Sequence, residues 1–158
     1  MTSRSNNKIS FTRALVSRLL HVYFLKRRGL TLGVRAIVRS DDEFLLVRHT
    51  YTPGWHFPGG GVEKGETLEQ ALNNELIQET GLKLASKPVF HGVFHNIHVS
   101  DRDHVLVYIC NIKGTIRNAR KNIEIAELNF FHYDKLPPDI DHGTSRRIRE
   151  IVFGEEMT

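Results

Sequence analysis

The chain has 158 residues, of which 40% are hydrophobic and 25% are charged, the proportions of an ordinary folded domain. It contains no run of eighteen apolar residues that could span a membrane, and its single cysteine, Cys110, excludes an internal disulfide. The formal net charge of +4 arises from the first forty residues, which hold nine Lys or Arg and no acidic residue. The basic balance therefore makes no strong case for nucleic-acid binding by the domain as a whole.

Residues 1–28 form a basic N-terminal extension, in which the pattern from Ser10 onward predicts an amphipathic helix. Three interpretations of this helix stay open. It packs on the domain or on a second copy of the chain in a homodimer, it lies on an anionic membrane surface, or it is a cleaved organelle-targeting segment. Cys110 sits inside an apolar run, which indicates a buried thiol. We expect a cytoplasmic location, with organelle targeting by residues 1–28 as the alternative.

The domain is expected to span residues 29–158 and to begin with a β-hairpin. Its strands are predicted at residues 31–39 and 43–49, with a Ser-Asp-Asp turn between them. A loop with two prolines follows and carries Trp55, the only tryptophan. Trp55 either anchors this loop or forms an aromatic wall for the base or sugar of a ligand.

A glycine-rich loop at residues 58–61 then leads into a predicted helix. Glycine there allows the backbone to approach a ligand closely. Thr67 and Gln70 have the spacing of a capping box at the start of the helix. Gly81 suits the left-handed position at its end.

Two carboxylates, Glu75 and Glu79, lie one turn apart on this helix and share a face. Like charges at that spacing repel each other, so a divalent cation is the obvious group to offset them. Because the available ligands are oxygens, Mg²⁺ or Mn²⁺ is favoured over zinc.

The remaining elements are two strands, a third segment with aromatic residues, and a short basic helix. The predicted positions are 89–95 and 104–112 for the two strands, 124–131 for the third segment, and 145–153 for the helix.

The stretch from the glycine loop through the helix resembles the Nudix box of the MutT-like hydrolases, Gly-x5-Glu-x7-Arg-Glu-U-x-Glu-Glu-x-Gly-U, where U is aliphatic. The positions that match are Gly60, Glu66, Glu75, Leu76, Glu79, Gly81 and Leu82. Two positions depart from the pattern: Asn74 stands in place of Arg, and Gln78 in place of the first Glu of the pair.

This resemblance implies an α+β fold, the α/β/α sandwich of the family with a mixed β-sheet. It also implies a Mg²⁺-dependent (or Mn²⁺-dependent) hydrolase that cleaves the pyrophosphate linkage of a nucleoside diphosphate linked to another moiety. The partner would then be a small-molecule nucleotide substrate.

The resemblance also assigns roles by position. Glu79 is the expected metal ligand, Glu75 is a ligand or the residue that handles the attacking water, and the Gly59 carbonyl is the expected backbone ligand. Gln78 keeps an oxygen that can coordinate the metal but lacks a charge. A further glutamate from a later segment often assists in this family, and Glu124 is the first choice here, with Glu127 second. The expected substrate-binding residues are Arg48, Trp55, Gly60 and Gly61, and the expected structural residues of the box are Glu66 and Gly81.

The two departures leave a second hypothesis beside the hydrolase. Gln78 removes a negative charge, and Asn74 cannot form the charge-assisted pair that Arg would make with a carboxylate. A chain weakened in this way would be a catalytically weak or inactive Nudix-fold module that binds a nucleotide or a partner protein.

Overall fold

The computed structural model describes residues 19–20, 23, 29–115 and 124–154. The chain divides into two compact units, Met1–Thr31 and Leu32–Thr158. Most of the predicted N-terminal helix lies outside the described residues. Leu19, Leu20 and Tyr23 are described, and they have a helical backbone and exposed side chains. Within the described part of the chain, no helix has both the length and the apolar character needed to cross a membrane.

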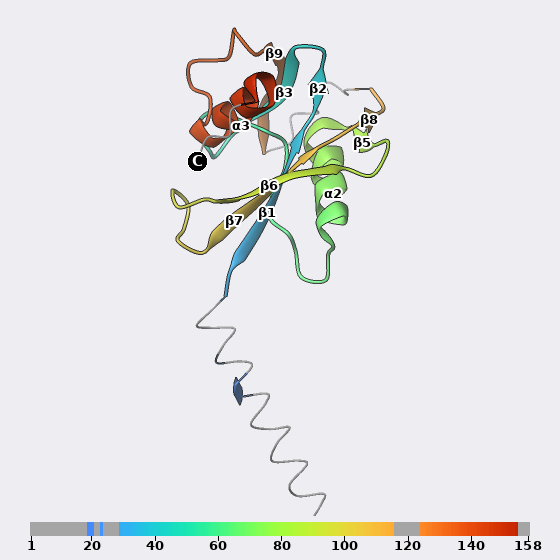
Figure 1. Ribbon diagram of the computed structural model, residues 1–158. Coiled ribbons are helices and arrows are strands. Elements are labelled where there is room, and N and C mark those ends of the chain that lie inside the picture. The colour runs from blue at the N-terminus through green and yellow to red at the C-terminus, as the bar shows by residue number, and fades with distance from the viewer. Residues whose placement is uncertain (1–18, 21–22, 24–28, 116–123, 155–158) are drawn as a thin grey trace, which may run out of the picture. The chain divides into compact units, whose positions relative to one another are not determined.

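The second unit contains three small sheets and two helices (Figure 1). The first sheet has the order β1 (Thr31–Ile37), β7 (Asp103–Ile109) and β6 (Val89–His95). The second has the order β2 (Arg39–Ser40), β3 (Glu43–His49) and β4 (Trp55–His56), and β9 (Ile125–His132) also pairs with β3. The third consists of β5 (Lys83–Leu84) and β8 (Ile112–Lys113). The helices are α2 (Leu68–Thr80) and α3 (His142–Phe153).

The predicted first hairpin is shorter in the structure than the sequence suggested. Of the predicted first strand, only the short segment β2 pairs with β3, with Arg39 opposite Phe44, and the turn places Asp41 at a φ of 52°. The preceding strand β1 ends at Ile37 and belongs to the sheet with β7 and β6. A continuous run of β-forming residues gives no signal for such a change of partner, because both sheets bury apolar side chains.

The two helices cover opposite faces of the strands (Figure 1). In β3, Leu45 packs in one core with Leu72 and Leu76 of α2, while Phe44 packs in a second core with Ile148 of α3. Successive strand residues point to opposite faces, so a strand covered on both sides is apolar throughout. Each of these fully buried leucines contributes about 1.5–3 kcal/mol relative to an exposed one. This arrangement confirms the predicted α/β/α sandwich.

The ends of α2 match the sequence signals. The Gln70 amide donates to Thr67 Oγ1 at 3.2 Å, the Thr67 amide donates to Gln70 Oε1 at 2.9 Å, and Gly81 has a φ of 78°. Helix α3 begins three residues earlier than predicted, because the carboxylate of Asp141 caps it by accepting from the Thr144 amide at 2.8 Å.

The predicted later strands are present as β6, β7 and β9. β6 and β7 pair antiparallel, from Val89 opposite Ile109 to His95 opposite His104. β3 and β9 also pair antiparallel, and their register shifts between Arg48 and His49. Beyond this bulge the Thr50 amide donates to the Glu124 carbonyl at 2.8 Å, which brings the start of β9 to the end of β3.

Candidate functional site

The glycine loop runs along β1 and is held to it by backbone hydrogen bonds. The Ala36 amide donates to the Pro58 carbonyl at 2.8 Å, and the Val34 amide donates to the Gly60 carbonyl at 2.9 Å. Gly59 has a φ of 144°, and a Cβ on it would lie 2.0 Å from the Val34 carbonyl oxygen. Only glycine fits so close to a neighbouring backbone.

The same loop approaches the helix carboxylates. A Cβ on Gly60 would lie 2.5 Å from Glu75 Oε1. The Gly59 amide donates to Glu79 Oε2 at 2.8 Å. Glycine at these two positions is therefore what allows α2 to bring its carboxylates against the loop backbone.

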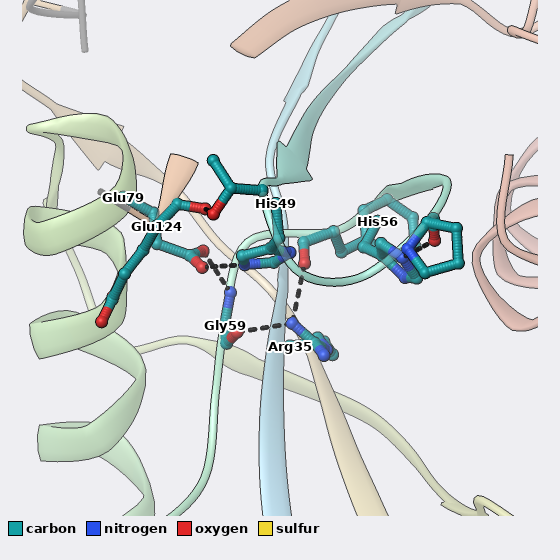
Figure 2. Close-up of polar contacts among 9 residues, drawn as sticks. Arg35, His49, His56, Gly59, Glu79 and Glu124 are labelled. Atoms are coloured by element: carbon teal, nitrogen blue, oxygen red, sulfur yellow. Dashed lines mark hydrogen bonds and ion pairs between the residues drawn. The ribbon is translucent and has the colours of Figure 1, made fainter. Parts of the chain in front are cut away.

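Glu79 is the most constrained of these carboxylates, with only 7% of the residue exposed. Besides the Gly59 amide, it contacts His49, whose Nε2 lies 2.6 Å from Glu79 Oε1 (Figure 2). His49 continues the face of β3 that carries Leu45 toward α2. Glu79 thus connects α2, β3 and the glycine loop.

Glu75 and Glu124 complete an acidic cluster with Glu79. The pKa of Glu75 is raised, first by burial and then by repulsion from Glu79, Glu124 and Glu66, and Arg35 partly offsets this rise. Glu124 lies at the end of β3, where its carbonyl is bonded to Thr50, and its side chain extends beside α2 (Figure 2). Three carboxylates from two distant segments therefore share one negative field, which a cation would relieve.

Arg35 is the cation that the structure places at this cluster. It projects from β1, and its Nη1 donates to the Gly59 carbonyl at 2.5 Å and to the Phe57 carbonyl at 3.3 Å (Figure 2). From the sequence alone we predicted no functional role for Arg35. Its only signal in the sequence was a single charge between the apolar neighbours Val34 and Ala36, both of which are buried.

The loop after β3 adds Tyr51, for which we predicted no role from the sequence, and His56 follows in β4. Tyr51 is 71% exposed, and its ring centroid lies 5.4 Å from that of His49. Burial raises the pKa of Tyr51, and the charges of Glu124 and Glu79 raise it further. The pKa of His56 is lowered by burial, against the opposing effect of its hydrogen bond to the Pro53 carbonyl. Exposed aromatic side chains in loops carry no pattern that distinguishes a site from ordinary surface.

Two of the expected substrate-binding residues are engaged elsewhere. Trp55 is 6% exposed and packs edge-on against Phe131, with the ring centroids 4.7 Å apart. Arg48 pairs with Glu127 at 3.2 Å and with Asp139 at 2.7 Å. Trp55 therefore anchors its loop in the core, and both Arg48 and Glu127 are committed to ion pairs.

The two departures from the box have separate surroundings. Asn74 donates to Glu66 Oε1 at 2.6 Å, and Glu66 Oε2 accepts from the Glu63 amide at 3.2 Å. Asn74 and Glu66 therefore fix the loop before α2 by neutral–charged hydrogen bonds. Gln78 is exposed on α2. Gly61 borders open space, where a Cβ would meet no atom within 4 Å.

The cluster suits a cation that is bound partly by its substrate. Among the described residues, no group of three His, Cys, Asp or Glu side chains is placed to hold a metal by itself. Mg²⁺ usually takes only one or two protein carboxylates and completes its shell with water and substrate phosphates. The repelling carboxylates of Glu75 and Glu79 beside the Gly59 carbonyl fit that requirement.

Known proteins are similar to this chain in fold and in sequence. A family model described as NUDIX domain matches residues 29–150. The chain is 34% identical over 110 residues to a protein of Methanocaldococcus jannaschii named ADP-ribose pyrophosphatase, a match that covers 66% of this chain and 63% of that protein. It is 32% identical over 123 residues to the NAD-capped RNA hydrolase NudC of Photorhabdus laumondii, covering 72% of this chain and 44% of that one.

The chain thus spans less than two thirds of the length of either relative. A crystal structure of a MutT NUDIX hydrolase from Burkholderia pseudomallei superposes with a TM-score of 0.69 at 23% identity and covers 78% of this chain and 99% of that one. The structural likeness supports the fold, and the family match covers most of the chain. Together with the glycine loop and the glutamates of α2, these matches show that the chain belongs to the Nudix hydrolase family.

Proposed function

We propose that the chain is a Mg²⁺-dependent hydrolase of the pyrophosphate linkage in a nucleoside diphosphate joined to another moiety. The observation that carries this proposal is the acidic cluster of Glu75, Glu79 and Glu124 beside the backbone of Gly59. Carboxylates that repel one another at the end of a glycine loop form a site for a cation and the phosphates that accompany it.

Each residue of the cluster has a distinct task in this proposal. Glu79 and Glu75, with the Gly59 carbonyl, would hold the cation, and Gln78 would offer a neutral oxygen at the exposed side of α2. A bound divalent cation would offset the phosphate charge and ease the deprotonation of water. Glu124 accepts the proton of the attacking water, since its competitor Glu127 is paired with Arg48. His49 keeps Glu79 oriented.

The substrate class rests on the named relatives. ADP-ribose and the NAD cap, the substrates in the names of two relatives, each contain an adenosine diphosphate joined to a further group. A linkage of this kind presents two adjacent phosphates to the acidic cluster and leaves a base and a second moiety for the surrounding loops.

Turnover of a substrate panel tests the proposal. The panel contains ADP-ribose, NAD, nucleotide sugars and nucleoside triphosphates, and it is run with Mg²⁺ or Mn²⁺ and with coupled detection of phosphate and pyrophosphate. We expect metal-dependent release of a nucleoside monophosphate, a loss of at least ~100-fold in Glu79→Gln, and little change in Glu69→Gln. Glu69 is an exposed residue in the first turn of the same helix, so it controls for the charge change.

The opposite outcome would favour a binding module. If wild type and Glu79→Gln show the same absence of turnover, while a nucleotide still binds regardless of metal, the chain has kept the fold without the chemistry.

A further inference from the structure

Arg35 lies inside the acidic cluster although it comes from the strand opposite α2. It is half-buried on β1, between the fully buried Val34 and Ala36. Its charge acts on Glu75 and on Tyr51, lowering the pKa of each against the stronger effects that raise it. A cation is therefore built into the site beside the groups proposed to hold the metal.

The hydrogen bonds of Arg35 involve only one of the three nitrogens of its guanidinium. Both come from Nη1, and both go to loop carbonyls, those of Phe57 and Gly59. A guanidinium has five N–H donors in a planar fork. Within the described part of the chain, Nε and Nη2 have no hydrogen-bond partner. One edge of the fork is thus still available to a ligand.

Arg48, the arginine that sequence position would favour as a phosphate ligand, differs on this point. Its Nη1 is bonded to Glu127 and its Nη2 to Asp139, so both ends of its fork already contact carboxylates. An arginine that meets phosphate needs an edge free for the paired oxygens. Arg35 satisfies this condition and Arg48 does not.

The charge balance of the site also favours a positively charged group that contacts the substrate. The cluster holds three carboxylates, and a pyrophosphate linkage brings at least two further negative charges to it. One divalent cation offsets only part of this, and the arginine of the box pattern is replaced by Asn74, which bonds to Glu66. Arg35 is positioned to supply the missing positive charge.

We propose that Arg35 binds a phosphate oxygen of the substrate through its Nε and Nη2 edge, while its Nη1 holds the glycine loop. This inference rests on the proposed function, because it deepens the assignment of that site. The Gly59 carbonyl has two lone pairs, so it can accept from Arg35 and keep one for a cation.

The test measures nucleotide binding and metal binding separately. Calorimetry with the hydrolysis-resistant α,β-methylene ADP, at saturating Mn²⁺, compares wild type with Arg35→Gln and Arg35→Lys. Electron paramagnetic resonance gives Mn²⁺ affinity in the absence of nucleotide. Arg39→Gln is the control, since Arg39 bonds to the turn at Asp41 and Asp42, at the start of β3.

We expect Arg35→Gln to weaken binding of the analogue by about 10–100-fold, as for loss of a charge-assisted hydrogen bond. Mn²⁺ affinity should change much less, by about threefold, because only the hydrogen bond that Nη1 makes to the Gly59 carbonyl bears on the metal ligands. The affinity of Arg35→Lys for the analogue should lie between those of wild type and Arg35→Gln, because a lysine keeps the charge without the planar fork of donors. Arg39→Gln should bind the analogue as wild type does.

Three results would overturn the inference. Unchanged binding of the analogue by Arg35→Gln would exclude a phosphate contact. An equal loss of analogue and Mn²⁺ binding would make Arg35 a clamp for the loop only. If Arg35→Gln does not fold, wild-type affinity in Arg35→Lys would exclude the fork contact. By contrast, a wild-type protein that neither binds the analogue nor turns over any substrate would overturn the proposed function itself, and this inference with it.

Discussion

The ionised carboxylate of Glu75 lowers the stability of the fold when no cation is bound. Burial and the neighbouring carboxylates raise its pKa above the ordinary value, so the folded state binds a proton there more tightly than the unfolded state does. Ionised Glu75 therefore destabilises the fold at neutral pH. Stability is regained as the pH falls through the raised pKa.

Removing this charge should stabilise the metal-free protein. We expect Glu75→Gln to raise Tm by about 1–3 °C at pH 7.5 in EDTA. The gain should shrink as the pH falls toward 4.5, the ordinary pKa of the carboxyl. With saturating Mn²⁺ the order should reverse, because wild type then gains the metal-binding energy. Thermal melts with and without EDTA measure both effects. A Glu75→Gln protein that melts below wild type in EDTA at neutral pH would show that Glu75 has a stabilising partner instead.

Gly59 is constrained by contact as well as by conformation. Its φ of 144° disfavours any side chain, and the Val34 carbonyl occupies the place of a Cβ. We expect Gly59→Ala to lower the free energy of unfolding by about 3 kcal/mol or more. Gly65→Ala is the matched control, because Gly65 has a positive φ of 84° with open space around it. It should lose only about 1 kcal/mol.

Urea denaturation measures both variants. If Gly59→Ala were no less stable than Gly65→Ala, the glycine loop would not lie against β1 as described.

At the scale of elements, α3 is joined to β6 by a partly buried polar contact. Glu150 bonds to Arg147 Nε at 2.6 Å and to His91 Nε2 at 3.1 Å, and Arg147 lies 3.7 Å above the ring of Phe94. Although burial opposes it, these hydrogen bonds lower the pKa of Glu150. Its contribution to stability is therefore present above the unfolded-state pKa and is lost as the pH falls through the lower folded-state value.

Removing the charge of Glu150 should lower the free energy of unfolding, because it weakens the contact between α3 and β6. We expect Glu150→Gln to cost about 2 kcal/mol, because Arg147, only 7% exposed, loses its charged partner. The exposed Glu63→Gln should stay within about 0.5 kcal/mol of wild type. Denaturation at pH 7 compares the variants with wild type, and the difference should narrow at acid pH. A loss that persists unchanged at pH 3 would argue that packing, not ionisation, is responsible.

The elements that the sequence predicted best are those with local signals. The capping box of Thr67 and Gln70 and the left-handed Gly81 set the bounds of α2. The chain passes from one sheet to another between β1, which ends at Ile37, and β2. This change was not predictable, because it depends on the pairing of β1 with β7, which comes some seventy residues later. The spacing of residues along the chain predicts local structure, but it does not predict which distant strand a strand will pair with.

At the scale of the whole domain, the site is assembled from segments that meet only in the folded state. Arg35, His49, Gly59, Glu79 and Glu124 come from β1, β3, the glycine loop, α2 and the segment before β9 (Figure 2). The sequence pointed to Glu75, Glu79 and Gly59 because the box spacing is local. The sequence favoured Arg48 and Trp55 over Arg35. It could not show that Trp55 is buried and Arg48 ion-paired, because burial and ion pairing depend on tertiary contacts.

We expect the acidic cluster of Glu75, Glu79 and Glu124 to bind a divalent cation despite Asn74 and Gln78. Titration with Mn²⁺, followed by electron paramagnetic resonance, tests it directly on wild type, Glu79→Gln and the exposed control Glu69→Gln. Our account predicts a bound ion in wild type and in Glu69→Gln, affinity reduced by about 10–100-fold in Glu79→Gln, and tighter binding in Gln78→Glu. Equal Mn²⁺ affinity in wild type and Glu79→Gln would contradict the account.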